Sequence, residues 1–296
     1  MQNSILLYGK NSIYEFYPFD KRNIIGEGGM GRVFKGIDTR SGKHVAIKAI
    51  FAELVQRPSI KERSELEAHL QFKHPNLIEM LDFCVTEEGR IHIISSLVIG
   101  KIIPNVTQII SGNTFERNRT ISNYIIKVLD ALTILHQKGI VHRDVKPDNI
   151  LIDSNNNPVL MDLGVAKASN GKRLTNAGVI IGTPHYSAPE QIKGEGDRIN
   201  STTDIYSTGI TLFELLTGSP PFDGSSQFDI MEMQIKKIIP HNDKITNDVF
   251  KVLKKATEKE QAKRYQSAQE LKSALQKTFT QKTFWEKLFS KNYLIC

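Results

Sequence analysis

The segment His142–Asn149 gathers side chains that together could transfer a phosphoryl group. Asp144 could accept the proton of an attacking hydroxyl, and Lys146 could neutralise charge on the phosphoryl group. Asn149 could ligate Mg²⁺ through its side-chain oxygen, because hard cations prefer oxygen donors. Apolar residues flank the segment on both sides, which predicts a loop pinned at each end. Such a mount suits a reaction that depends mostly on positioning and charge stabilisation. Further along the chain, Asp162 is a second candidate metal ligand.

Residues 26–33 read GEGGMGRV, a glycine cluster between two apolar segments. Glycines let backbone amides approach phosphate oxygens without a side chain in the way. A dinucleotide-binding fold would need a helix directly after Gly31. Instead, Val33–Ile37 has the pattern of a returning strand, which disfavours that fold. The cluster therefore indicates either a phosphate-binding hairpin or an ordinary turn.

Lys48 ends the apolar run Val45–Ile47, which predicts a strand. Its ammonium is either a solvated edge charge or a ligand of nucleotide phosphates, held by a carboxylate from the next helix. That helix is predicted over 58–72 from its apolar spacing and its many charges. Glu65 is the candidate partner. Because one sequence does not determine the helical register, two alternatives stay open, Glu62 and Glu67.

Strand and helix patterns divide the chain into two parts. The first part reads as strands plus this one helix, with strands expected around 24–25, 33–37, 45–47, 77–85 and 91–95. From Ile121 the pattern becomes helical, with an apolar stripe that ends at Gly139 and a segment at 204–216 that is apolar nearly all round. Further helical segments are expected at 251–257 and 268–275. The change near 100–118 predicts a connection between two lobes.

Composition excludes several classes of protein. The chain has 296 residues, of which 40% are hydrophobic and 24% charged, so wholesale disorder is not expected. A net charge of +7 comes without a long basic arm or an RNP-like aromatic motif, so no nucleic-acid partner is expected. Two cysteines, Cys84 and Cys296, form no CxxC pair or Cys/His cluster, which argues against zinc and fits a reducing compartment. Without a secretion signal or a transmembrane segment in the sequence, we expect a cytoplasmic protein.

Five motifs, taken in chain order, resemble those of the protein kinase superfamily. They are the glycine cluster, Lys48, the loop at 142–149, Asp162 and the run GTPHYSAPE at 182–190. The likeness runs from Ile24 to Leu275. The form of the glycine cluster is most similar to bacterial (Hanks-type) serine/threonine kinases. The resemblance implies an α+β, bilobal protein kinase fold, with a small β-rich N-lobe carrying one main helix and a larger, mostly helical C-lobe. The expected divisions are an N-terminal segment 1–20, a kinase domain 21–279 with lobes at about 21–98 and 99–279, and a helical tail 280–296.

Several site residues follow from the resemblance, with ATP and Mg²⁺ as cofactors. Asp144 would be the catalytic base, with Lys146 beside the γ-phosphate. Lys48 would bind the α- and β-phosphates and pair with Glu65. Two residues would hold Mg²⁺, Asn149 and Asp162. The expected ATP-binding residues are Gly26, Glu27, Gly28, Gly29, Met30, Gly31, Val33, Ala46, Lys48 and Leu151.

The implied function is a non-specific serine/threonine protein kinase, which transfers the ATP γ-phosphate to Ser/Thr hydroxyls of protein substrates, its own activation loop included. Lys146, two places after Asp144, and Thr183 resemble serine/threonine rather than tyrosine kinases. The alternative is a pseudokinase scaffold that binds nucleotide without transfer, and the retained catalytic groups argue against it. Small-molecule phosphotransferases of this fold generally lack the segment with Thr183 and Pro189-Glu190.

Three residues are expected to have supporting, structural roles. By resemblance, Glu190 and Arg264 form a buried ion pair that closes the C-lobe, and Asp204 bonds the backbone of the catalytic loop.

Arg143 indicates how the enzyme is regulated. In this family such an arginine usually meets a phosphate on the activation loop. Thr175, flanked by basic residues, is the acceptor that we expect to be autophosphorylated. The loop offers two other acceptors, Ser169 and Thr183, and an unmodified Thr175 is the remaining alternative.

The residues after the matched region carry apolar side chains near helical spacing, with lysines between them. One interpretation is a basic amphipathic helix that binds a membrane or a partner, with dimerisation or partner docking through the tail. The other is a helix that docks its apolar face onto the C-lobe.

Overall fold

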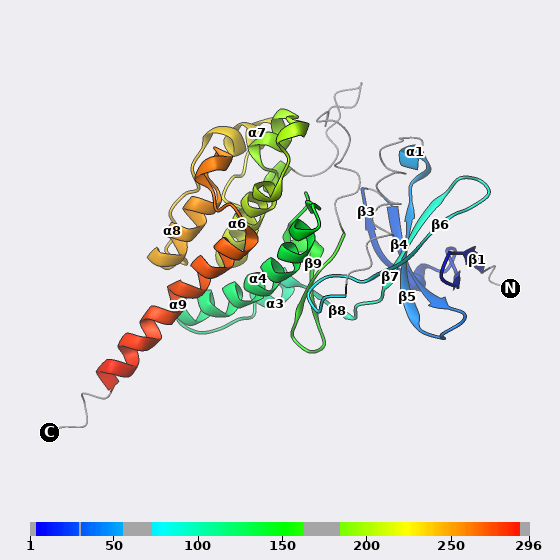
Figure 1. Cartoon of the computed structure of the whole chain (residues 1–296), viewed down its shortest axis with the longest axis horizontal. Coiled ribbons are helices and arrows are strands. Elements are labelled where there is room, and N and C mark those ends of the chain that lie inside the picture. The colour runs from blue at the N-terminus through cyan, green and yellow to red at the C-terminus, as the bar shows by residue number, and fades with distance from the viewer. Residues whose placement is uncertain (1–3, 30, 56–72, 163–183, 291–296) are drawn as a thin grey trace. The chain divides into compact units, whose positions relative to one another are not determined.

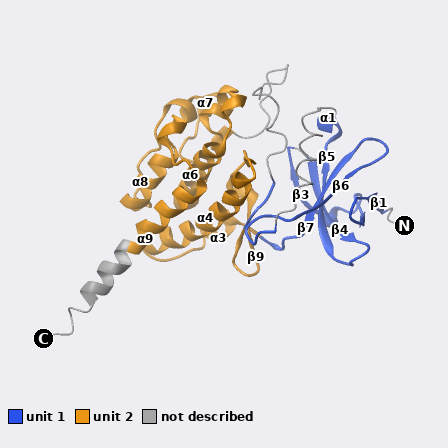
Figure 2. Cartoon of the chain, viewed as in Figure 1, with its two compact units in different colours: residues 1–100, 159–182 blue, residues 101–158, 183–296 orange. Residues whose placement is uncertain are grey.

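The computed structural model describes residues 4–29, 31–55, 73–162 and 184–290, with the backbone alone for 281–290. The chain separates into two compact units (Figure 2). Unit 1 comprises residues 1–100 and 159–182, and unit 2 comprises residues 101–158 and 183–296. The chain therefore leaves unit 1 after Gly100 and returns to it at Val159.

Unit 1 is built around one antiparallel sheet of seven strands (Figure 1). β3 (Ile24–Gly28) pairs with the first half of β4, and β2 pairs with its second half. A short helix, α1 (Ala52–Val55), follows β5. The other strands lie in the order β1 (Ile5–Tyr8), β2 (Ile13–Phe16), β4 (Gly31–Asp38), β5 (His44–Ile50), β7 (Ile91–Ser96) and β6 (Met80–Val85). β5 is therefore an interior strand, bonded to β4 and β7.

Each face of this sheet has its own hydrophobic core, because successive side chains of a strand point to opposite faces. One core contains Ile50, Leu54, Ile78, Met80, Ile91, Ile93 and Val159. The core on the other face contains Leu7, Tyr14, Phe16, Phe34, Val45, Ile47, Cys84 and Ile94. Burial on both faces specifies the strand register strongly, since a slip of one residue would exchange the two sets.

Unit 2 is mostly helical, with α6 (Ser201–Thr217) at its centre (Figure 1). α6 is buried along nearly its whole length, which confirms the segment predicted at 204–216. It packs against α3 (Ile103–Thr107), α4 (Thr114–Gln137), α8 (Asn247–Ala256) and α9 (Ala268–Ser290). α5 (Pro189–Lys193) contacts α7 (Gln227–Lys236). A small sheet has the strand order β10 (Pro158–Leu160), β9 (Ile150–Asp153) and β8 (Gly100–Ile102).

Local sequence signals begin and end these helices. Asn113 caps α4 by accepting the N–H of Glu116, and Asn200 caps α6 by accepting the N–H of Thr202. α6 ends at Gly218, whose φ of +94° favours glycine. These caps satisfy backbone groups that the helices themselves leave unpaired.

Some helices and strands differ from those that the sequence predicted, and one predicted helix lies outside the described residues. The strand predicted over 77–85 begins only at Met80, because Leu77 makes isolated bridges to His74 and Leu160. The N-terminal segment, for which no strand was predicted, forms β1 and β2. The helix predicted over 58–72 lies outside the described residues. Among the described residues, no helix is both long enough and apolar enough to span a membrane.

Candidate active site

Lys48 lies on the interior strand β5, opposite Val33 of β4 and Ile93 of β7. Its Nζ donates to Oδ1 of Asp162 over 2.8 Å, and 15% of its side chain is exposed. Asp162 has a φ of +49°, a conformation that few residues other than glycine adopt. Folding thus joins the lysine that is predicted to bind phosphate and a candidate metal ligand 114 positions away. The proposed pairing of Lys48 with Glu65 stays a prediction, because Glu65 and its alternatives lie outside the described residues.

The glycine cluster forms the turn between β3 and β4, with Gly28 opposite Gly31. Gly31 is required for packing, because a Cβ there would lie 2.0 Å from the carbonyl oxygen of Ala49. At Gly28 and Gly29 a Cβ would meet nothing within 4 Å among the described atoms, and neither has a left-handed φ. Open space beside backbone amides is what bound phosphate oxygens need. This open space is compatible with the predicted role of the two glycines at the phosphates of ATP.

Glu27 and Arg32 join the two strands that flank this turn. They are opposite each other in the register of β3 and β4. The Arg32 guanidinium donates to both carboxylate oxygens of Glu27, over 2.9 and 3.2 Å, and these hydrogen bonds lower the pKa of Glu27. The side chain of Glu27 is thus engaged within the hairpin itself.

Four of the predicted ATP-binding residues remain to be located, and three of them lie in the described parts of the two units. Val33 on β4 and Ala46 on β5 are both half-buried in unit 1. Leu151 is half-buried on β9 in unit 2. Met30 lies outside the described residues. The contact of these residues with ATP stays a prediction.

The catalytic-loop residues of unit 2 lie together as the sequence predicted. The side-chain amide of Asn149 donates to the carbonyl oxygen of Asp144 over 2.8 Å and to its Oδ2 over 3.1 Å. Nζ of Lys146 is 3.7 Å from the same Oδ2, and 17% of the Asp144 side chain is exposed. A short 3-10 helix, Pro147–Asn149, sets the position of the amide. One carboxylate thus stands beside an amide donor and an ammonium.

Asp204, buried at the start of α6, holds the backbone of this loop. Its two oxygens accept the N–H groups of His142 and Arg143 over 2.8 and 2.7 Å. Nε2 of His136, at the end of α4, lies 2.7 Å from the same carboxylate. The predicted role of Asp204 is therefore confirmed, and His136 joins it as a contact that no sequence pattern indicated.

Two more side chains position the loop and were missed by sequence reasoning. Gln191 of α5 donates to the carbonyl oxygen of Arg143 over 3.0 Å, and Thr211 of α6 donates to that of Val145 over 3.3 Å. Both act across long sequence separations, so no local spacing could have identified them. The glutamine directly after Glu190 was the one available signal.

Arg143 combines a strained backbone with a buried charge. Its φ is +67°. Burial lowers the pKa of its guanidinium, and Nε has no hydrogen-bond partner among the described residues. A buried cation with an unused donor is suited to receive an anion.

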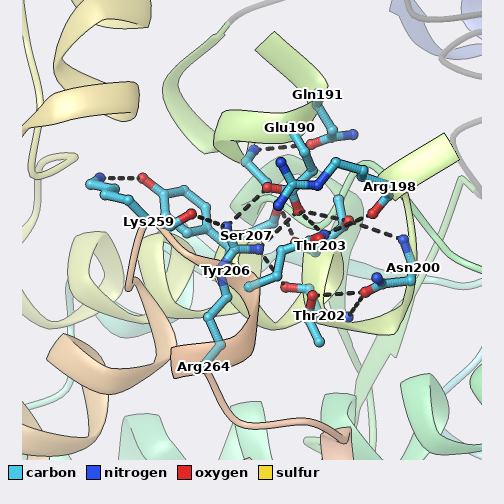
Figure 3. A network of polar contacts seen from close by, with 12 residues as sticks. Glu190, Gln191, Arg198, Asn200, Thr202, Thr203, Tyr206, Ser207, Lys259 and Arg264 are labelled. Atoms are coloured by element: carbon cyan, nitrogen blue, oxygen red, sulfur yellow. Dashed lines mark hydrogen bonds and ion pairs between the residues drawn. The ribbon is translucent and has the colours of Figure 1, made fainter. Parts of the chain in front are cut away.

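Glu190 and Arg264 form the buried ion pair that the sequence predicted (Figure 3). The guanidinium donates to the two carboxylate oxygens over 2.8 and 2.9 Å, and the two side chains are 0% and 3% exposed. Burial alone would raise the pKa of Glu190, but Arg264 lowers it below its ordinary value. Thr203 donates to the same carboxylate over 2.8 Å.

Lys259 lies next to this pair, against aromatic rings and without a carboxylate partner among the described residues (Figure 3). Its Nζ donates to the hydroxyl of Tyr206 over 2.7 Å. The same Nζ is 5.0 Å from the ring centre of Tyr206 and 4.7 Å from that of Phe222. Burial, and then the nearby Arg264, lower the pKa of Lys259 to about 7.

Each of the two predicted metal ligands keeps one side-chain oxygen for a divalent metal that arrives with a nucleotide. Because Nδ2 of Asn149 is committed to Asp144, its Oδ1 is the atom left to ligate. Asp162 uses Oδ1 for Lys48, which leaves Oδ2. The described residues contain no cluster of three or more metal-ligating side chains. Mg²⁺ commonly takes one or two carboxylates plus phosphate oxygens and water, so a cage made of protein alone is not needed.

Several predicted residues lie outside the described parts of the chain. They include Glu65, Met30, Thr175 and Thr183. Their predicted roles stay predictions.

Comparison with known proteins gives a consistent result. The sequence model of the protein kinase domain matches residues 19–279. A probable serine/threonine-protein kinase of Streptomyces coelicolor is 34% identical over 273 residues, which cover 88% of this chain and 39% of that protein. The serine/threonine-protein kinase PknB of Mycobacterium tuberculosis is 32% identical over 268 residues, covering 87% of this chain and 42% of that protein. The chain thus spans about two fifths of the length of these curated relatives.

Among solved structures, the PknI kinase domain of Mycobacterium tuberculosis matches with a TM-score of 0.66. The match covers 92% of this chain and 96% of that one, at 20% sequence identity. It confirms the predicted α+β fold, with a β-rich first lobe and a helical second lobe.

Proposed function

The chain belongs to the protein kinase family, and on that premise we propose that it phosphorylates serine and threonine residues of proteins with ATP and Mg²⁺. The observation that carries this proposal is the grouping of Asp144, Lys146 and Asn149 on a loop whose backbone is held by Asp204. A rigid loop of this kind can provide positioning and charge stabilisation, which phosphoryl transfer needs most.

Unit 1 contributes the groups that bind nucleotide. The turn at Gly28 and Gly29 offers backbone amides to phosphate oxygens, and Lys48 binds the α- and β-phosphates. Asp162 keeps Lys48 extended through their 2.8 Å ion pair and retains one oxygen for the metal.

Unit 2 contributes the groups that act on the acceptor. Asp144 takes the proton of the Ser/Thr hydroxyl, and Asn149 fixes the orientation of its carboxylate. Lys146 neutralises charge on the γ-phosphate as it moves. Asn149 and Asp162 are the residues that would hold Mg²⁺, which would supply positive charge to the phosphate oxygens.

The test is transfer from γ-labelled ATP in the presence of Mg²⁺, to the protein itself or to a generic basic protein. Asp144→Asn keeps the shape of the side chain and removes the base, and the expected loss is about 100-fold or more. Asp197→Asn, an exposed change in the same unit, is the matched control and should leave transfer unchanged. ATP binding without transfer in the unaltered protein would identify a scaffold instead.

Regulation through Arg143 forms part of the proposal. A phosphate on Thr175 would supply an anionic partner for Nε of Arg143, which has no hydrogen-bond partner among the described residues. Autophosphorylation of Thr175 is therefore activating. Undiminished activity of Thr175→Ala would disprove it.

The working compartment that we propose is the cytoplasm, where ATP and protein substrates are available. The buried, unpaired thiol of Cys84 is compatible with a reducing environment. A docking role for the tail rests on its sequence alone, since α9 continues to Ser290 but its side chains beyond residue 280 are not described.

A further inference from the structure

The N-terminal hairpin, β1 and β2 with the turn between them, precedes the region that matches the kinase domain. It nevertheless extends the sheet of unit 1, because β2 pairs with β4 from Tyr14 to Phe16. Thr39, just after β4, also donates its N–H to the carbonyl oxygen of Ile13 over 2.9 Å. The hairpin is therefore joined to the sheet by backbone hydrogen bonds on one side.

The inner face of the hairpin covers the back of the strand that carries Lys48. Its three core residues, Leu7, Tyr14 and Phe16, are each 2% exposed. They share a hydrophobic core with Val45 and Ile47 of β5. Lys48 alternates with these two residues, so its side chain lies on the other face of β5, where it meets Asp162.

The turn of the hairpin is docked on Asp82 of β6. The carboxylate accepts the N–H groups of Lys10 and Asn11 over 3.1 and 2.7 Å, and the hydroxyl of Tyr14 over 3.1 Å. Asp82 is 3% exposed and has no lysine or arginine partner among the described residues. Burial and this carboxylate raise the pKa of Tyr14, which keeps its hydroxyl protonated as a donor.

Gly9 shows how closely the turn and the carboxylate approach each other. A Cβ at this position would lie 2.3 Å from Oδ2 of Asp82. Its φ is not left-handed, so the glycine serves the close approach rather than the backbone conformation. The side chain of Asn11 adds a bond to the carbonyl oxygen of Leu81 over 2.8 Å.

We propose that this hairpin is a working part of the nucleotide-binding unit and that Asp82 is a positioning residue, which clamps the hairpin onto the back of β5 and so fixes the strand that presents Lys48. The clamp of the hairpin onto β5 is a property of the structure alone. The positioning role rests on the proposed function, because it requires that Lys48 binds ATP.

The physical reason is that β5 is held on two faces. Removal of the clamp would expose Val45 and Ile47 to water and leave β5 supported by the other core and by its neighbouring strands. Displacement of a binding group by about 1 Å can cost up to about 100-fold in rate. A loosened β5 therefore affects the use of ATP before it affects the fold of the whole chain.

The experiment compares two lesions of one contact with a matched control. Asp82→Asn keeps the shape but turns an amide donor toward donor N–H groups, and Gly9→Ala pushes the turn off the carboxylate. Gly89→Ala is the control: it strains a turn of the same sheet, where φ is +76°, at the β6–β7 end. Asn11→Ala, which removes one exposed contact, is the milder variant if Asp82→Asn does not fold.

Hydrogen exchange of the β5 amides tests the clamp without reference to any activity. We expect exchange at Val45–Ile50 to be about tenfold faster or more in Asp82→Asn and Gly9→Ala, because each lesion disrupts hydrogen bonds to a buried charged group. Gly89→Ala, compared at equal distance from its melting temperature, should leave these amides unchanged. Unchanged β5 protection, with only the hairpin amides exchanging faster, would show that the hairpin is an appendage and would overturn the proposal.

Kinetics then test the positioning role. kcat/KM for ATP should fall by about 3- to 30-fold in the two lesions, with a raised KM for ATP and an unchanged KM for the protein substrate. Partial unfolding would instead lower kcat and leave both KM values as they were, which would overturn the positioning role. If the unaltered protein transfers no phosphate at all, the proposed function fails, and the exchange experiment still decides whether the clamp exists.

Discussion

Replacement of Lys259 by methionine is expected to stabilise the protein, although it removes contacts. Lys259 carries its ammonium into a partly buried aromatic site with a hydroxyl as hydrogen-bond partner. Taking an ammonium out of water is costly when no carboxylate forms an ion pair with it. Methionine fills a similar volume without a charge and makes good contacts with aromatic rings.

The size of the effect follows from the pKa of Lys259, which falls from 10.5 to about 7. Because a tenfold change in proton affinity is worth about 1.4 kcal/mol, the charged state costs at most about 5 kcal/mol on folding. The cation–π contacts and the bond to Tyr206 are lost with the lysine and offset part of that gain. A net stabilisation of about 2 kcal/mol remains, which is about 3 °C in Tm for a chain of 296 residues.

The sign of the pH dependence is a sharper test than the magnitude. Between pH 7 and 10.5 the unfolded chain binds a proton at Lys259 that the folded protein releases, so the stability of the unaltered protein rises with pH through this window. The advantage of the methionine variant should therefore be full below pH 7 and should shrink toward pH 10.5.

Thermal unfolding followed by circular dichroism at pH 6.5, 8 and 9.5 measures this difference. Lys255→Met is the matched control, because Lys255 also lies over an aromatic ring, 4.5 Å from the centre of Tyr265, but is exposed. For this control, the difference in Tm between the variant and the unaltered protein should not change with pH. The reasoning would be refuted if Lys259→Met were less stable than the unaltered protein at pH 6.5. It would also be refuted if the difference in Tm between the two proteins did not change with pH.

Three further predictions concern other parts of the molecule. Reversal of one charge of the Glu27–Arg32 pair should raise KM for ATP by less than about fivefold, since exposed pairs contribute little. The double exchange Glu27→Arg with Arg32→Glu should restore the original KM. Asp20→Asn, which breaks the exposed Asp20–Arg22 pair, should leave KM for ATP unchanged. Arg264→Met should lower the free energy of unfolding in urea by about 3–5 kcal/mol, because Glu190 is left buried and without its ion-pair partner. Adding Glu190→Met should recover much of the lost stability. Equal stability of the single and double variants would contradict this account. Removal of divalent cations with EDTA should abolish phosphate transfer, and added Mg²⁺ should restore it. The circular dichroism spectrum should stay unchanged, since the described residues form no metal cluster that folding could depend on. Loss of folded structure on chelation would show a structural metal instead.

The sequence predicted those parts of the site that lie close together along the chain. Asp144, Lys146 and Asn149 are within six positions of one another, so a single loop brings them together. The family resemblance supplied two long-range contacts that the structure confirms, the Glu190–Arg264 pair and the support from Asp204. The apolar patterns also predicted the two long helices α4 and α6, although α4 begins at Thr114, seven positions before the predicted start at Ile121.

Other contacts could not be predicted because they have no local pattern. Asp82 reads as one acid in a strand, and only the fold shows that the turn at Gly9–Ser12 lies against it. Gln191 and Thr211 bond carbonyl oxygens, which any polar side chain can do. The N-terminal hairpin was overlooked although its two short apolar runs flank a glycine-containing turn, which is a recognised hairpin signal.

The bond between Asp204 and the catalytic loop also orders events during synthesis of the chain. Asp204 is translated 61 positions after Arg143, whose backbone it holds. At roughly 5–20 residues per second, a ribosome needs about 3 to 12 seconds to cover that interval. Through this time the nascent loop lacks its anchor on α6, whereas every described strand of the first sheet has already been made. On the proposed function, a partly synthesised chain therefore has its phosphate-binding lysine before it has an ordered base, so the ability to transfer phosphate is acquired late in translation.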